Sequence, residues 1–154
     1  MSARIVVRVQ KEIFDIEAEA SALTRGRTDI GALVTFTGFC RDENGALTAL
    51  EIEHYPGMAE AEITRVVNEA TARWPLEGVV ALHRYGLIRP GEPIVLVATA
   101  SLHRGEAFLA ASFLMDFLKT EAPFWKKQHL ADQTSGDWVA AKAQDDAAAQ
   151  KWRV

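Results

Sequence analysis

The chain has 154 residues, of which 49% are hydrophobic and 25% are charged, and its formal net charge is −4. This length suits a single domain over residues 1–154 with a substantial core, and the composition is that of an ordinary soluble globular protein. The acidic balance argues against general affinity for nucleic acid, which usually requires an excess of basic residues. One cysteine excludes an intrachain disulfide framework and fits a reducing cytoplasm.

No segment of the sequence predicts export or membrane insertion. The N-terminus lacks the basic start and the apolar run of a signal peptide. No uninterrupted apolar run is long enough to cross a bilayer. We therefore expect a cytoplasmic protein with no membrane partner.

The first part of the chain predicts two strands and one helix. β-Branched residues over Arg4–Gln10 predict a strand, and Asp15 is placed to cap a helix over Ile16–Leu23. Gly31–Phe39 is rich in β-formers and predicts a buried strand, in which Gly38 marks a bulge or a close backbone approach.

A polar loop over Cys40–Gly45 follows, and it contains the turn-forming pair Asn44-Gly45. After it, the alternating segment Leu47–Tyr55 predicts a half-buried strand. We expect the strands on either side of this loop to form a hairpin, although the loop is longer than a two-residue turn.

The middle of the chain predicts a helix over Met58–Trp74, because apolar residues recur on one face until Pro75 ends the segment. A strand over Val79–Tyr85 and a loop over Gly86–Glu92 follow. Ile94–Ala100 is almost continuously apolar, which predicts a strand covered on both faces.

The C-terminal part predicts less regular structure. Ala131–Gly136 reads as a loop, Trp138-Val139 as a short strand, and Asp145–Trp152 as a terminal helix or a partly disordered tail. The alternation of strands and helices along the whole chain predicts an α/β or α+β domain.

Glu106–Thr120 predicts a helix that is apolar on nearly every side. Such a helix must be buried all round. A single domain of this length has limited room to cover it, so we favour an interface between identical subunits, with a plain core helix as the alternative.

Charged residues lie at both ends of this helix. Lys119 lies in its last turn, where the helix dipole favours a cation, and Lys126 and Lys127 follow Phe124-Trp125. Lysines beside aromatic surface can have lowered pKa values and serve as acid–base or anion-binding groups. The alternative is that these lysines are solvated surface charges.

At the other end, His103 and Arg104 follow the apolar strand directly, and free backbone N–H groups with an arginine suit a phosphate or carboxylate. Surface residues at a turn would have the same pattern. Arg104 and Lys119 are about 22 Å apart along a helix. If both serve one site, Lys119 of one subunit must lie near His103 and Arg104 of the other.

Several common site patterns are absent. The histidines and the cysteine show no His-x-x-x-His or Cys-x-x-Cys spacing, so no metal site is predicted. No Gly-x-Gly-x-x-Gly or glycine-rich lysine loop indicates a nucleotide. Cys40 lies beside Arg41, which can activate a thiol, but no histidine partner is visible and we favour an inert cysteine.

Six segments, in order, resemble the large, catalytic subunit of molybdopterin synthase. They are GALVTFTGFCRD, LEIEHYPGMAE, RWPLEGVVALHRYGLIRPGE, VLVATASLHRGEAF, FLMDFLKTEAPFWKK and DWVAA. The resemblance extends from about Gly31 to Trp138. It implies an α/β hammerhead fold with an additional antiparallel β subdomain.

The resemblance also implies an activity and partners. Two large subunits form a homodimer within a heterotetramer, and each end holds a small ubiquitin-like subunit whose Gly-Gly C-terminus carries a thiocarboxylate. The enzyme transfers sulfur from that terminus to cyclic pyranopterin monophosphate and forms the dithiolene of molybdopterin, without a cofactor of its own. This chain does not end in Gly-Gly, so we expect it to be the large subunit.

By position, Lys119 and Lys126 match the catalytic lysines of the family. The matched substrate-binding positions are Phe39, Cys40, Arg41, His103, Arg104, Lys119, Lys126, Lys127 and Gln128. Some relatives have a lysine in place of Phe39, an acidic residue in place of Gln128 and an arginine in place of Lys142. The alternative function is a non-catalytic module that docks a ubiquitin-like protein.

Overall fold

The computed structural model describes residues 3–42, 44–131, 135–139 and 143–153. Within these ranges it contains two sheets and four helices. The strands are β1 (Arg4–Gln10), β2 (Ala32–Phe39), β3 (Leu47–His54), β4 (Leu76–Arg84), β5 (Gly86–Ile88), β6 (Pro93–Ser101), β7 (Phe124–Leu130) and β8 (Ser135–Val139). The helices are α1 (Ile16–Ala22), α2 (Met58–Arg73), α3 (Arg104–Thr120) and α4 (Ala143–Gln150).

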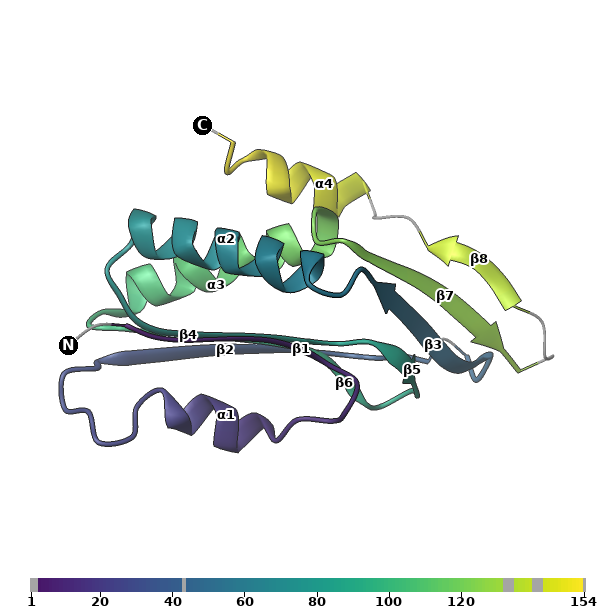
Figure 1. The fold of residues 1–154 in the computed structure, drawn as a ribbon, viewed down its shortest axis with the longest axis horizontal. Coiled ribbons are helices and arrows are strands. Elements are labelled where there is room, and N and C mark those ends of the chain that lie inside the picture. Colours follow the sequence, from purple (N-terminus) through teal and green to yellow (C-terminus); the bar gives the residue numbers. More distant parts are fainter. Residues whose placement is uncertain (1–2, 43, 132–134, 140–142, 154) are drawn as a thin grey trace.

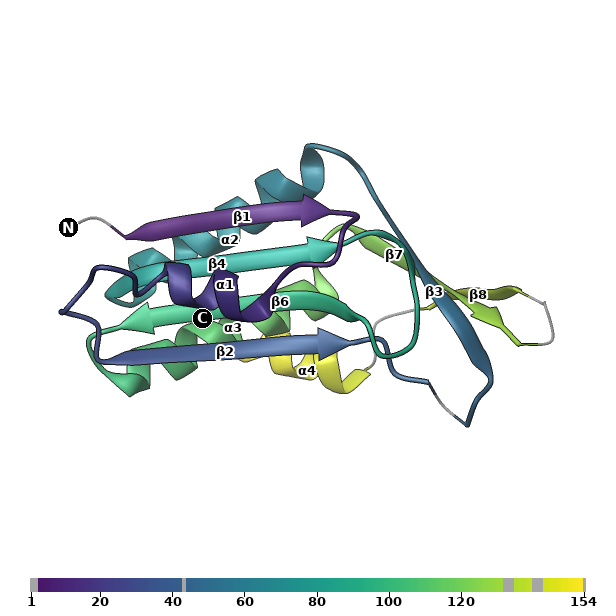
Figure 2. The same cartoon turned by 90° about the horizontal axis from the view of Figure 1, so that it is seen from below.

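The first sheet has the strand order β1-β4-β6-β2, in which β1 and β4 are parallel and the other neighbours are antiparallel. Helix α1 covers one face of this sheet, and α2 and α3 cover the other (Figures 1 and 2). The sheet therefore separates two layers of core.

Both central strands of this sheet bury side chains on both faces. Val79 and Val97 pack in the core on the α2 and α3 side, whereas Leu82 and Leu96 pack on the α1 side. This arrangement confirms the prediction that Ile94–Ala100 is covered on both faces, because successive strand residues point in opposite directions.

The second sheet has the order β5-β3-β7-β8 and is antiparallel throughout. It extends beyond one end of the helical layers (Figure 1). The predicted mixed fold with an additional antiparallel sheet is confirmed.

The predicted hairpin is wrong. β2 pairs with β6, and β3 pairs with β5 and β7, so the two strands belong to different sheets. The connection between them is too long to enforce pairing, and it carries the chain from the edge of one sheet into the other. The β2 register shifts after Gly38, which confirms the predicted bulge, and a Cβ there would lie 2.8 Å from Cγ1 of the Val95 side chain rather than from backbone.

Two other predicted segments differ from the structure: Gly86–Glu92 begins with strand β5, and β8 begins at Ser135 within the predicted loop. Strand β7, over Phe124–Leu130, was not predicted. These short strands lack a clear alternation of their own, and pairing with β3 or β7 defines them.

The helix ends follow the local signals. Asp15 accepts a hydrogen bond from the Ala18 backbone N–H at 3.0 Å and caps α1. α2 ends at Arg73 because Trp74, before Pro75, is extended with ψ 147°. No helix in the described ranges is long and apolar enough to cross a membrane.

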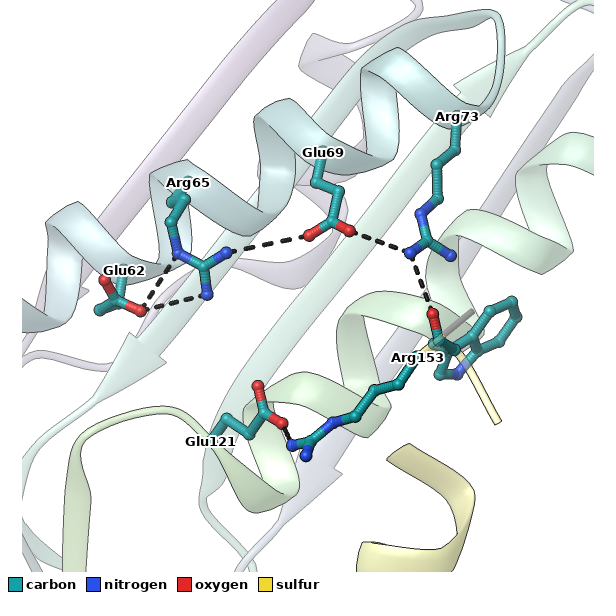
Figure 3. A network of polar contacts seen from close by, with 7 residues as sticks. Glu62, Arg65, Glu69, Arg73, Glu121 and Arg153 are labelled. Carbon is teal, nitrogen blue, oxygen red and sulfur yellow. Dashed lines mark hydrogen bonds and ion pairs between the residues drawn. The ribbon is translucent and has the colours of Figure 1, made fainter. Parts of the chain in front are cut away.

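The C-terminal residues are anchored on α2 and α3. The Trp152 ring lies edge-on to Trp74 and Phe113, with centroids 5.8 and 5.5 Å away, and its Nε1–H donates to Asp116 at 2.5 Å. An ion-pair ladder of Glu62, Arg65, Glu69 and Arg73 on α2 leads to the Trp152 carbonyl, and Arg153 pairs with Glu121 (Figure 3). The predicted terminal helix is confirmed as α4.

Replacing Asp15 tests the α1 cap. Asp15→Ala removes the acceptor for the Ala18 N–H and should lower the free energy of unfolding by about 1 kcal/mol, measured by urea denaturation. Asp15→Asn keeps an acceptor oxygen and should stay close to the wild type. Equal loss in both variants would contradict the assignment of the cap.

Candidate functional site

A short connection brings two of the predicted lysines together. α3 ends at Thr120, residues 121–123 turn the chain, and β7 starts at Phe124. Pro123 cannot continue the helix, so the chain reverses at once. Lys119 at the end of α3 and Lys126 in β7 therefore line one cavity.

We call this cavity the lysine cavity. It lies where α3 meets the ends of β2, β4 and β6 and the start of β7, and its lining residues are Gly38, Phe39, His83, Ile94, Val95, Met115, Leu118, Lys119 and Lys126. Its volume is about 40 Å³. A single water needs a cavity volume of about 10–15 Å³, so this cavity has room for little more than water and a substrate must lie at its mouth.

The two amines have different surroundings. Burial, followed by repulsion from the nearby Lys119 cation, lowers the pKa of Lys126 to about 8, while Asp145 on α4 acts in the opposite direction. Lys119 is exposed at the helix end. A lysine with a pKa near 8 can exchange protons close to neutral pH, as acid–base catalysis requires.

Sequence reasoning missed His83. It is 3% exposed at the end of β4, in a strand whose other inward residues are apolar, and it lines the lysine cavity. Burial first, then the positive charges of Lys126 and Lys119, lower the pKa of His83 to about 3. A single histidine within an apolar strand was the available signal.

Phe39, Cys40 and Arg41 lie in different environments. Phe39 is 53% exposed and lines the cavity, whereas Cys40 is 3% exposed and belongs to the core. Burial, with Glu92 and Asp42 nearby, raises the pKa of the Cys40 thiol, which fits the expectation of an inert cysteine. Arg41 is exposed in the following loop.

His103 and Arg104 lie at the opposite end of α3 from the lysine cavity. His103 is the N-cap of α3 and Arg104 is its first residue, and both side chains are exposed. The structure of one chain therefore does not bring them to Lys119, in line with the length of the helix.

One chain does not cover α3 on all sides, as the preference for an interface between identical subunits expects. Exposed side chains at Arg104, Phe108, Ser112 and Lys119 form a stripe along it, which we call the α3 stripe. Phe108 is 60% exposed, and the neighbouring Leu109 is 46% exposed. The alternative of a plain core helix does not account for so much exposed apolar surface.

The remaining predicted site residues lie on β7 or beyond it. Lys127 pairs in register with Glu51 of β3 and, one residue after Lys126, points to the opposite face of the sheet. Gln128 is exposed on the same face as Lys126. Lys142 lies outside the described residues.

Larger hollows lie elsewhere on the surface. One of about 310 Å³ lies between α2, α3 and the C-terminal residues, and one of about 800 Å³ lies beside β3 and β5. Neither contains a predicted site residue. The paired amines and the lowered pKa of Lys126 therefore make the lysine cavity the candidate site.

Comparison with known proteins gives a family. The model of the MoaE protein family matches residues 9–121. The molybdopterin synthase catalytic subunit of Rhizobium meliloti (strain 1021) is 64% identical over 152 residues, which cover 99% of this chain and 98% of that protein. The protein of the same name from Pseudomonas aeruginosa is 46% identical over 150 residues, covering 96% and 99%.

Solved structures share the fold. The molybdopterin biosynthesis MoaE protein from Burkholderia ambifaria MC40-6 has a TM-score of 0.82 at 44% identity, covering 100% of this chain and 99% of that one. Molybdopterin synthase from Staphylococcus aureus has a TM-score of 0.75 at 28% identity, covering 90% and 96%. The matches in sequence and in fold agree across nearly the whole chain. The chain therefore belongs to the family of molybdopterin synthase catalytic subunits, the MoaE proteins.

Proposed function

We propose that this chain is the sulfur-transferring subunit of a molybdopterin synthase, and that Lys119 and Lys126 are its catalytic residues. Sulfur from a thiocarboxylated protein terminus replaces oxygen on cyclic pyranopterin monophosphate in this reaction. Attack by sulfur and loss of oxygen both require proton transfers. The observation that carries the proposal is the meeting of both lysines at one cavity, where the pKa of Lys126 is lowered to about 8.

The substrate phosphate fits the cationic side chains around this cavity. Lys119 lines it and Arg41 lies two residues after Phe39, whereas Arg104, at the far end of α3, would reach it from a second chain. Arginine forks and lysines both bind phosphate oxygens. Phe39, His103 and Gln128 complete the proposed binding set, from which the orientation of Lys127 and the burial of Cys40 remove these two predicted members.

Sulfur is supplied by a small partner subunit in this proposal. The relatives are named catalytic subunits, which implies that the enzyme has another subunit. We propose that the partner is ubiquitin-like and that its Gly-Gly terminus reaches the lysine cavity. Delivery on a partner removes the need for a nucleophilic cysteine here, which agrees with the buried Cys40.

The α3 stripe supports a homodimer. Two α3 helices packed antiparallel about a two-fold axis would cover Phe108 and place Arg104 of one chain near Lys119 of the other. The same contact would enlarge a cavity that is too small for a pterin in one chain.

The second candidate function is a docking module without catalysis. Docking alone does not require two amines at one cavity, nor burial that lowers the pKa of Lys126. The lysine pair therefore favours the enzyme.

The double variant Lys119→Ala, Lys126→Ala tests the catalytic assignment. With thiocarboxylated small subunit and pterin precursor supplied, dithiolene formation should fall by at least about 100-fold, because both proton-transfer groups are gone. Lys11→Ala, at an exposed lysine beside another hollow, is the control and should remain active. Product at the wild-type rate from the double variant would leave only the docking function.

The ionisation of Lys126 can be measured directly by NMR of its side chain. Its titration should centre near pH 8 rather than 10.5, so that about one amine in ten is neutral at pH 7. Lys119→Ala removes a neighbouring cation and should raise the pKa of Lys126, although burial, the larger cause, remains. A titration near 10.5 in the wild type would contradict the described surroundings of Lys126.

Hybrid dimers test whether each site uses two chains. Lys119→Ala and Arg104→Ala proteins, inactive alone, should recover about one quarter of wild-type activity after random subunit exchange, because each hybrid has one intact site. Lys119→Ala mixed with Lys126→Ala is the control. Those residues share one chain's cavity, so every site in that mixture keeps a defect. Absence of recovery in the first mixture, with exchange verified by native mass spectrometry, would refute the shared site.

A further inference from the structure

Residues 143–153, which we call the C-terminal segment, pack on α3 away from the lysine cavity. Phe113 and Phe117 of α3 face the hollow beside this segment, whereas Leu118 and Lys119 line the lysine cavity. Among the residues that the structure describes, none from the C-terminal segment lines that cavity. The last turns of α3 therefore separate the segment from the site.

This end of α3 has no terminating glycine. Glu121, the C-cap, keeps a right-handed helical conformation with φ −110° and ψ −13°, and Ala122 and Pro123 follow it. The backbone N–H groups of Glu121 and Ala122 both donate to the Phe117 carbonyl, at 2.8 and 3.3 Å. A left-handed glycine commonly completes the hydrogen bonds of a last turn. Without one, the turn that carries Lys119 is expected to fray unless other contacts hold it.

Side chains of the C-terminal segment bind this turn on both sides of Lys119. The Trp152 Nε1–H donates to the Asp116 carboxylate at 2.5 Å, three residues before the lysine. The Arg153 guanidinium pairs with Glu121, two residues after it (Figure 3). The first contact is a hydrogen bond to a charged acceptor, which is stronger than one between neutral groups. The second joins two partly exposed side chains and contributes less.

Trp152 is itself fixed by other elements. Its ring lies edge-on to Trp74 and Phe113, and its backbone carbonyl accepts a hydrogen bond from Arg73 of α2 at 3.0 Å. The Arg73 guanidinium lies 4.7 Å from the centroid of the Phe113 ring. The hydrogen bond to Asp116 thus connects the end of α3 to α2 and to packed aromatic rings.

We propose that Trp152 is a positioning residue for the sulfur-transfer reaction: through its hydrogen bond to α3 it holds the last turn of that helix, and with it Lys119, beside Lys126 at the lysine cavity. Arg153 supports the same turn. The inference rests on the proposed catalytic role of the two lysines. It assigns to Trp152 and Arg153 no contact with the substrate.

The variant Trp152→Phe isolates the hydrogen bond. It keeps a ring for the aromatic contacts but has no N–H to donate to Asp116. The ring must be kept because α4 carries Asp145, whose charge raises the pKa of Lys126, so release of the whole segment would change two effects at once. Gln150→Ala, at an exposed position of the same segment, is the matched control.

Hydrogen exchange measures whether the turn is held. In Trp152→Phe the backbone N–H groups of Glu121 and Ala122 should exchange about tenfold faster, because loss of one hydrogen bond permits more frequent local opening. Adding Arg153→Ala should increase the rate further, whereas Gln150→Ala should leave it unchanged.

The second readout is the pKa of Lys126, titrated by NMR in the complete protein. The Lys119 cation lowers this pKa, so a turn that no longer holds Lys119 in place should let it rise by about half a pH unit in Trp152→Phe. In the Lys119→Ala background Trp152→Phe should cause no further rise, because the cation through which it acts is gone. A merely structural role predicts no shift, or a shift that persists without Lys119.

Unchanged exchange at Glu121 or an unchanged pKa of Lys126 in Trp152→Phe overturns the proposal, as does an equal rise of this pKa in both backgrounds. Neither measurement depends on turnover. If both respond as expected while Lys119→Ala forms dithiolene at the wild-type rate, the catalytic role of Lys119 is rejected and its positioning by Trp152 stands. If Lys119→Ala is inactive and neither readout responds, the positioning role alone is rejected.

Discussion

Packing of α3 against β2 and β6 is the constraint on which the rest of the structure depends. Its buried face includes Phe113, Leu114 and Phe117, and each fully buried side chain of this size contributes about 1.5–3 kcal/mol. The same packing sets the direction of the helix, so Lys119 emerges beside the strand ends and the turn at Pro123 returns the chain as β7. The position of the lysine cavity thus follows from the packing of α3 on the sheet and from the turn that joins α3 to β7.

Closing that layer around Lys126 has an electrostatic cost. Partial burial of the Lys126 amine and the nearby Lys119 cation both favour the neutral form of the amine. They lower the pKa of Lys126 to about 8, where the amine can exchange protons near neutral pH. His83 lies in the same cavity and carries no charge, so it adds polarity without a third cation. The proposed reactivity of Lys126 follows from the burial of its amine and from the positive charge of Lys119.

Much of the local structure could be predicted because its causes are local. The Asp15 cap and the end of α2 before Pro75 each depend on a residue and its immediate neighbours. The hairpin prediction was wrong because strand pairing depends on segments far away in the sequence. β2 pairs with β6, whereas β3 pairs with β5 and β7. The sequence indicated that one chain would leave part of α3 uncovered, but composition does not say which side of the helix, and only the structure shows that Phe108 lies on it.

The sequence by itself determined the mixed α and β character, the two-sided burial of Ile94–Ala100, the charged ends of α3 and, through its motifs, the family. Periodicity and residue type carry that information directly. Only the tertiary structure decided that Lys119 and Lys126 share a cavity, that Lys127 faces the other way, and that His83 stands beside the two amines. These residues lie on elements that are far apart in the sequence. Their relative positions are set only when β4, α3 and β7 pack together around one core.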